Sequence, residues 1–243
     1  MFHRRGKSIS LTETGNTLFN LTGRYFQIES EAEFLLKSTL NNERGVFRLA
    51  ANQAAWLFAS ASVFKKKFPA IELKTCLRHS ERLERELIDY RHDLVIISNK
   101  VDDETIDCQL MQQEPFTLTI NKEHPLSQYE SVILPDFKDL KLYLLPEHQY
   151  TNGNLNNWLK SNDHRHIFYC GDKEFVVEAI AHAEAVSFLT QSMVKKDPRL
   201  RSVQISDFPF EHRTYIAFQR KTMAKRFITK MIEDFPRISE TMG

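Results

Sequence analysis

The sequence of 243 residues has little cysteine and almost no net charge, and each shortage excludes a class of protein. Its three cysteines, Cys76, Cys108 and Cys170, lie far apart and are odd in number. This spacing argues against a disulfide framework and against a metal site built on paired cysteines, so we expect reduced, largely buried thiols. The 33 basic and 32 acidic residues leave a net charge of +1, so no overall basicity indicates a nucleic-acid partner.

Long apolar runs and common enzyme motifs are also missing. No stretch approaches the length needed to cross a membrane, and no apolar signal segment follows the basic residues Arg4, Arg5 and Lys7. The sequence contains no GxSxG elbow, no P-loop, no GxGxxG and no HExxH. We therefore expect a cytoplasmic protein that is not an enzyme, with no catalytic residues, no cofactor and no membrane partner.

Histidines near carboxylates are the remaining candidates for metal ligands. His182 follows Glu178 by four residues, His212 adjoins Glu211, and His164 lies two residues before another histidine. Each group lacks the third and fourth ligands that a metal site needs. We therefore expect no metal site and interpret these histidines as solvated or structural.

The most regular feature present is a long segment with helical periodicity. From Thr12 to about Asn41 there is no proline, and Thr12 is predicted to cap the helix with Glu13 at the positive end of its dipole. Apolar residues recur at alternating spacings of three and four, which is a heptad seam. Its members are Leu18, Leu21, Tyr25, Ile28 and Leu35. We expect this helix to dimerise, and packing against its own domain is the alternative.

Strand-like and helix-like stretches alternate from Val46 onward. The first group comprises strands at 46–51, 71–76 and 94–98 and helices at 54–68 and 80–90. The second comprises strands at 116–121, 142–145, 166–170 and 186–189 and helices at 155–161 and 173–183, followed by strands at 203–205 and 214–218 and a helix at 223–235. This order predicts two α/β units with parallel strands, and ligands of such sheets bind beyond the carboxyl ends of the strands.

Five motifs in the same order resemble LysR-type transcriptional regulators. The opening FHRRGKSISLTETG is similar to the family's wing and the start of its linker helix, and it matches that pattern at Phe2, Arg4, Leu11, Thr12 and Gly15. Four later stretches resemble successive parts of the family's effector domain: FRLA, VFKKKFPAIEL, ELIDYRHDLVI and INKEHPL. The motifs lie between residues 2 and 126, and we take the resemblance to cover essentially the whole chain.

The resemblance implies a winged helix-turn-helix, a dimerising linker helix and an effector domain of two Rossmann-like α/β subdomains of the periplasmic-binding-protein type II kind. The implied limits are a wing remnant at 1–11, a linker helix at 12–41, subdomain I at 46–116 and 216–243, and subdomain II at 117–215. In the family the recognition helix precedes the wing, so we expect Arg4, Arg5 and Lys7 to make only weak contacts with DNA phosphates. Promoter DNA would be bound by a form that carries the complete N-terminal domain.

The resemblance also suggests where a small-molecule effector binds. Polar residues follow three strands of the first subdomain, and a polar segment precedes a helix of the second. The residues are Asn52, Gln53, Ser80, Ser98, Asn99, Tyr150, Thr151 and Asn152. Amide N–H groups at helix starts favour a polar or anionic ligand. For Ser80, an N-cap of the second helix and an effector contact are equally good interpretations. Residues 172–174 are interpreted as a helix cap rather than as an effector contact.

These observations predict a LysR-type DNA-binding transcriptional regulator, represented by its linker helix and its effector-binding domain. We expect a homodimer or homotetramer that senses a polar or anionic small molecule. The alternative is a standalone metabolite-sensing oligomerisation module that does not itself bind DNA.

Overall fold

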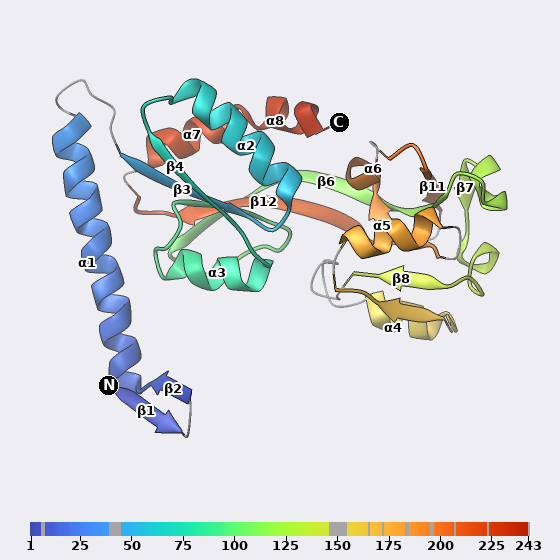
Figure 1. Cartoon of the computed structure of the whole chain (residues 1–243), viewed down its shortest axis with the longest axis horizontal. Helices are drawn as coiled ribbons and strands as arrows, with labels where there is room; N and C mark the ends of the chain where they lie inside the picture. Colours follow the sequence, from blue (N-terminus) through green and yellow to red (C-terminus); the bar gives the residue numbers. More distant parts are fainter. Residues whose placement is uncertain are drawn as a thin grey trace. The chain divides into compact units, whose positions relative to one another are not determined.

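The computed structural model describes residues 1–5, 8–38, 45–145, 155–164, 166–171, 173–182, 185–194, 197–206, 208–222 and 224–242. The chain divides into two compact α/β units, drawn in Figure 1. Unit 1 comprises 1–97, 101–109 and 216–239, and unit 2 comprises 98–100, 110–215 and 240–243. The predicted limits of the wing remnant, linker helix and subdomains stay predictions.

A hairpin and a long helix open the chain. Strands β1 (Phe2–Arg5) and β2 (Ser8–Leu11) pair antiparallel and lead into helix α1 (Glu13–Ser38). Thr12 caps α1, because its Oγ1 accepts a hydrogen bond from the Gly15 N–H at 3.1 Å. The Thr12 N–H donates to the Met1 carbonyl at 2.9 Å, and a Cβ at Gly15 would collide with that same oxygen. Glycine is therefore what lets the hairpin approach the first turn so closely.

Helix α1 leaves four residues of its predicted seam on the surface of the single chain. The exposed fractions are 41% for Leu18, 54% for Leu21 and 63% for both Tyr25 and Ile28. Leu35 lies further along the same helix. Large apolar side chains that stay exposed along one helical stripe are typical of a surface that contacts another molecule. Within the described part of the chain, no helix combines the length and apolarity needed to cross a bilayer.

Unit 1 is built on a sheet with the strand order β4–β3–β5–β12–β6. The strands are β3 (Val46–Ala51), β4 (Glu72–Leu77), β5 (Leu94–Ile97), β6 (Ile106–Asn121) and β12 (Glu211–Gln219). Strand β3 pairs in parallel with both β4 and β5, so the carboxyl ends of these three strands meet at one edge. Strands β6 and β12 continue from unit 1 into unit 2. The prediction for β6 was wrong at its start, which lies at Ile106 instead of Phe116.

The helices of unit 1 cover an aromatic core. They are α2 (Ala54–Lys67), α3 (Ser80–Ile88), α7 (Lys225–Glu233) and α8 (Phe235–Met242), the last of which ends in unit 2. Phe47 stacks on Phe64 with ring centroids 4.6 Å apart, and Phe227 meets both rings edge-on. Such pairs add to the free energy gained by burying the rings.

The helix predicted for 223–235 corresponds to α7, and a further helix that was not predicted, α8, follows it. Helix α7 ends at Glu233, and α8 begins at Phe235 with Pro236 in its first turn. Proline lacks the N–H that would continue the hydrogen bonds of α7, but the first turn of a new helix does not need that donor. The prediction therefore ended near the correct residue but missed the helix that begins beside Pro236.

Unit 2 holds the remaining strands of this eight-stranded sheet, in which β6 pairs with β10 and β11, and β11 pairs with β7. An isolated bridge joins Leu142 to Val186 beside β10, and β8 pairs with β9. The strands are β7 (Ser131–Val132), β8 (Leu142–Leu144), β9 (Ile167–Tyr169), β10 (Ser187–Thr190) and β11 (Leu200–Ile205). The helices are α4 (Leu155–Ser161), α5 (Lys173–Ala181) and α6 (Gln191–Val194), with 3-10 turns η1 (Pro125–Gln128) and η2 (Leu134–Asp136).

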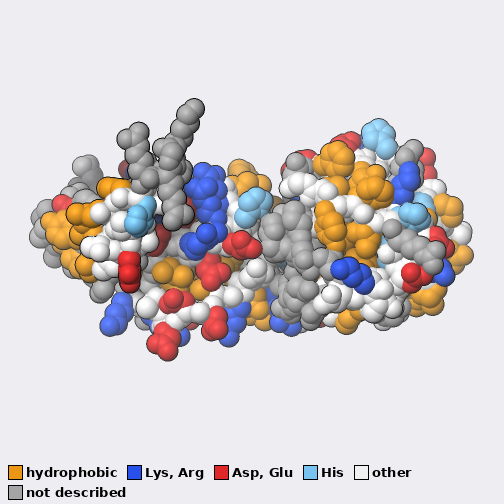
Figure 2. All heavy atoms as spheres, turned by 90° about the horizontal axis from the view of Figure 1, so that it is seen from below, with side chains coloured by type: hydrophobic (Ala, Val, Ile, Leu, Met, Phe, Trp, Pro, Cys, Tyr) orange, Lys and Arg blue, Asp and Glu red, His pale blue; other side chains and the backbone are white. Residues whose placement is uncertain are grey.

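Unit 2 also exposes aromatic side chains. Phe168 and Tyr169 on β9 and Phe175 on α5 are each about half exposed, and Tyr143 stacks on Phe168 at 4.9 Å. Figure 2 shows hydrophobic side chains, in orange, gathered on the viewed face of this unit. Contiguous apolar surface of this kind is typical of interaction sites.

Candidate functional site

Two of the predicted effector residues meet at the carboxyl-end edge of the unit 1 sheet. The Asn52 side-chain amide donates a hydrogen bond to Ser80 Oγ at 2.9 Å. The Asn52 backbone N–H donates to the Ile96 carbonyl at 3.0 Å, which ties the end of β3 to β5. Ser80 is buried and Asn52 is half-buried, so Asn52 is the more accessible member of the pair. Parallel pairing thus brings together two residues that lie 28 positions apart.

The prediction that Ser80 caps helix α3 was wrong. The N-cap is His79, and Ser80 is the first residue inside the helix. The Ser80 hydroxyl instead accepts the hydrogen bond from Asn52. The side chain therefore belongs to the polar edge rather than to the helix terminus.

The start of helix α2 lies directly after Asn52. Gln53 is its N-cap and is half-buried, and the two alanines that follow are exposed. The first turn of α2 contains no acidic residue, whereas its last turn carries three lysines. The positive end of the helix dipole and its backbone N–H groups therefore favour an anionic or polar group near Asn52.

Ser98 and Asn99 follow β5 and belong to unit 2. Ser98 is 2% exposed, and its Oγ lies 3.1 Å from Nε2 of His212, which is 4% exposed. Burial lowers the pKa of His212 to about 4, so its imidazole is neutral at pH 7. Ser98 is therefore held inside unit 2 by a histidine that the sequence analysis placed only in a general structural role. Asn99 is half-buried.

Other predicted residues are placed in part. Tyr150, Thr151, Asn152 and Lys7 lie outside the described residues, whereas Arg4 and Arg5 lie in β1 of the hairpin.

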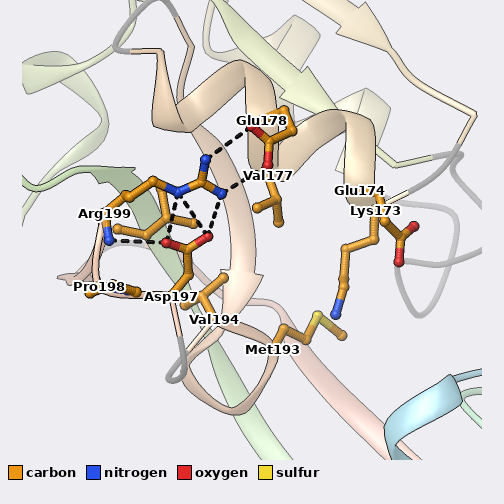
Figure 3. Close-up of a pocket in the computed structure, with 10 residues that line it drawn as sticks. Lys173, Glu174, Val177, Glu178, Met193, Val194, Asp197, Pro198 and Arg199 are labelled. Carbon is orange, nitrogen blue, oxygen red and sulfur yellow. Dashed lines mark hydrogen bonds and ion pairs between the residues drawn. The ribbon is translucent and has the colours of Figure 1, made fainter.

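Unit 2 contains a pocket of about 540 Å³ that the sequence analysis did not predict. Figure 3 shows its lining from α5, α6 and the segment before β11. Six of the lining residues are Lys173, Glu174, Glu178, Met193, Asp197 and Arg199. Two residues interpreted as a helix cap, Lys173 and Glu174, therefore line a pocket. No local spacing signals it, because its walls come from separate elements.

Arg199 dominates the charge arrangement of the pocket. Its Nη1 and Nη2 donate to the two Glu178 oxygens at 3.0 and 2.8 Å, and Nη2 also donates to Asp197 at 2.7 Å (Figure 3). The hydrogen bonds from Arg199 lower the pKa of both carboxyl groups. The five charged lining residues comprise two bases and three acids, a sum of −1. The pocket therefore disfavours an anion, in contrast to the polar edge of unit 1.

Comparison with known proteins connects this geometry to a family. Residues 41–235 match the family model described as the LysR substrate binding domain. The chain is 22% identical over 227 residues to the RuBisCO operon transcriptional regulator of Allochromatium vinosum, covering 90% of this chain and 75% of that protein. It is 20% identical over 216 residues to the probable RuBisCO transcriptional regulator of Phaeodactylum tricornutum, covering 84% and 70%.

Solved structures share the fold. The BenM effector binding domain with its effector benzoate has a TM-score of 0.69 at 19% identity, covering 82% of this chain and 93% of that one. A full-length OxyR variant from Pseudomonas aeruginosa has a TM-score of 0.69 at 17% identity, covering 96% and 83%. These likenesses confirm the predicted α/β fold of the periplasmic-binding-protein type II kind. Because the family model covers most of the sequence, the chain belongs to the LysR family and carries its substrate-binding domain at residues 41–235.

Proposed function

We propose that this chain is the linker helix and effector-binding part of a LysR-type transcriptional regulator that senses a polar or anionic small molecule. The observation that carries the proposal is the Asn52–Ser80 pair beside the positive end of α2. Relatives named as transcriptional regulators support the role, and the BenM domain binds benzoate, a carboxylate. An anionic ligand at this edge would gain hydrogen bonds from Asn52 and from the N-terminal turn of α2.

The proposed mechanism is a shift between conformations and involves no catalytic step. Effector binding favours one conformation of the effector domain, and α1 passes that preference to the DNA-binding part of the complete regulator. The protein acts in the cytoplasm, where promoter DNA is bound by a form carrying the complete N-terminal domain. Arg4, Arg5 and Lys7 add weak, salt-sensitive contacts with phosphates.

Effector binding is tested with a thermal-shift screen of small carboxylates, amino acids and sugar phosphates, since a ligand that binds the native state raises its melting temperature. We expect one chemical group of compounds to stabilise the wild type and to lose that effect in Asn52→Ala. Arg199→Ala is the matched control in the unit 2 pocket and should respond as the wild type does. A hit that stabilises Asn52→Ala fully but fails with Arg199→Ala would move the site to unit 2.

Self-association is the second part of the proposal. The exposed seam of α1 and the exposed aromatics of unit 2 support a homodimer or homotetramer. Light scattering of Leu21→Lys with Ile28→Lys should shift the chain towards monomer, because two lysines in the seam repel their copies in the partner helix. Asn16→Lys with Ser30→Lys adds the same charge at helix positions outside the seam and should leave the assembly intact. A monomeric wild type would contradict this part.

A further inference from the structure

Three potential metal ligands gather in unit 1, outside the residues of the candidate effector site. They are Cys76 on β4, Glu86 near the end of α3 and His92 beyond that helix. One ligand atom from each residue lies within 4.8 Å of the others. The side chains of His92 and Glu86 are only 10% and 12% exposed, and Cys76 is half-buried. The cluster is therefore largely shielded from solvent but still reachable.

The backbone holds the two later ligands in place. Helix α3 is anchored by Leu83 and Leu87, both fully buried. After the helix, Tyr90 has a φ of 58°, and the Arg91 N–H donates to the Glu86 carbonyl at 2.8 Å while the Tyr90 N–H donates to that of Leu87 at 3.0 Å. This is a Schellman turn with tyrosine at the left-handed position where glycine is usual. The turn reverses the chain and returns His92 to the side of Glu86.

A neighbouring arginine fixes the carboxylate. The Arg82 Nε donates to one oxygen of Glu86 at 2.8 Å, and the other oxygen lies 2.9 Å from His92 Nε2. Outer partners of this kind orient metal-binding side chains. Arg82 also interacts electrostatically with Cys76.

We propose that Cys76, Glu86 and His92 bind a zinc ion, with water as the fourth ligand. A sulfur, a nitrogen and an oxygen ligand form a set that zinc accepts in tetrahedral geometry, and the thiolate disfavours magnesium and calcium. Zinc bond lengths place tetrahedral ligand atoms about 3.3–3.7 Å apart. His92 and Glu86 would separate by roughly 0.5 Å to admit the ion. The proton that His92 Nε2 shares with Glu86 and the thiol proton of Cys76 would both pass to solvent as the nitrogen–zinc and sulfur–zinc bonds form, with the second imidazole proton kept on Nδ1.

The proposed site would clamp helix α3 and the turn after it to strand β4. It does not depend on the proposed effector site, and the sequence analysis expected no metal here. The ligands are ten and six residues apart along the chain, which matches none of the short spacings that mark zinc motifs.

The experiment uses the full chain, freed of any affinity tag and stripped with a chelator. After equilibration with zinc chloride and gel filtration, elemental analysis should find one zinc per chain. Replacement by cobalt should give the thiolate-to-cobalt charge-transfer absorption. Cys76→Ser and His92→Gln should each abolish that absorption, and the matched control Cys108→Ser should retain it. Arg82→Gln, which removes only the outer partner, should weaken binding by roughly tenfold.

A second comparison distinguishes a variant that has lost zinc binding from one that has merely lost stability, because each protein is compared with itself with and without zinc. Zinc should raise the melting temperature of the wild type and of Cys108→Ser, and it should leave that of His92→Gln unchanged. Less than one zinc per wild-type chain after equilibration, or unchanged cobalt absorption in both Cys76→Ser and His92→Gln, would overturn the proposal.

Discussion

The two units use polar side chains in opposite ways. At the edge of unit 1, Asn52 and Ser80 are neutral and lie beside the positive end of α2. In the unit 2 pocket, the charge of Arg199 is already matched by Glu178 and Asp197. Neutral donors at the unit 1 edge can form hydrogen bonds with a negatively charged ligand. The Arg199 guanidinium already pairs with two carboxylates, so its positive charge is not available to a ligand. Two similar α/β scaffolds thus carry different arrangements of polar side chains, and we expect these residues rather than the fold to decide which unit binds an anion.

Their interiors differ as well. Both units pack aromatic rings, around Phe64 in unit 1 and around Phe188 and Phe208 in unit 2, but unit 2 also buries His164 and His212. Burial lowers the pKa of both imidazoles. Unit 2 should therefore lose more stability in acid than unit 1 does.

The largest expected effect comes from the aromatic core. Phe64→Ala removes a fully buried ring that contacts three other phenylalanines, so the free energy of unfolding should fall by about 3–5 kcal/mol. Phe58→Ala on the same helix is the control, because that ring is 77% exposed and its loss should change stability by less than about 0.5 kcal/mol. Urea denaturation measures both. Equal losses would contradict the placement of α2.

Acid should weaken unit 2 next. His212 has a pKa of about 4 in the folded chain and about 6.5 when unfolded, so the unfolded state binds more protons between these values. The contribution of the neutral His212 to the free energy of unfolding is fully present above pH 6.5. It falls by roughly 2–3 kcal/mol as the pH drops towards 4. His212→Gln should flatten this part of the profile in denaturation experiments across pH. An unchanged slope in the variant would contradict the buried neutral imidazole.

The Asn52–Ser80 hydrogen bond should have a smaller effect. A double-mutant cycle of Asn52→Ala and Ser80→Ala should give a coupling of about 0.5–1.5 kcal/mol in the unfolding free energy, the usual range for one such bond. Additive single effects would mean that the two side chains do not interact.

The Arg199 network should have the least effect on stability. The side chains of Arg199 and Glu178 are about half exposed, and solvent and salt screen such pairs. Arg199→Ala should lower the melting temperature slightly at low salt and leave it unchanged at high salt. A large, salt-independent loss would show that the network supports the fold of unit 2.

Local patterns in the sequence predicted the features that depend on neighbours along the chain. The heptad spacing, the cap at Thr12 and the alternation of strands and helices are of this kind, and parallel pairing then implied that Asn52 and Ser80 share an edge. Of the two interpretations of Ser80, the N-cap was wrong because its hydroxyl accepts a hydrogen bond from a residue on another element. The extension of β6 back to Ile106 was missed because that stretch is half-exposed and shows no strand alternation.

Contacts between distant residues left no local signal. Ser98 meets His212 across 114 positions, and Arg199 meets Glu178 across 21. Ser98 follows β5 and His212 lies on β12, its neighbour in the sheet, whereas Arg199 precedes β11 and Glu178 lies on α5, so both contacts arise only when elements distant in sequence pack together. The cluster of Cys76, Glu86 and His92 likewise depends on the turn at Tyr90. A tyrosine does not signal such a turn, because glycine is the usual residue with a positive φ.

The most direct test of the effector site is calorimetric titration of the best carboxylate from the screen into three proteins. Asn52→Ala should weaken binding by roughly tenfold or more relative to the wild type, because it removes a hydrogen bond to a charged group. Arg199→Ala should leave the Kd within about twofold, since its charge is already paired in the unit 2 pocket. Unchanged affinity in Asn52→Ala, together with lost binding in Arg199→Ala, would contradict an effector site at the strand ends of unit 1.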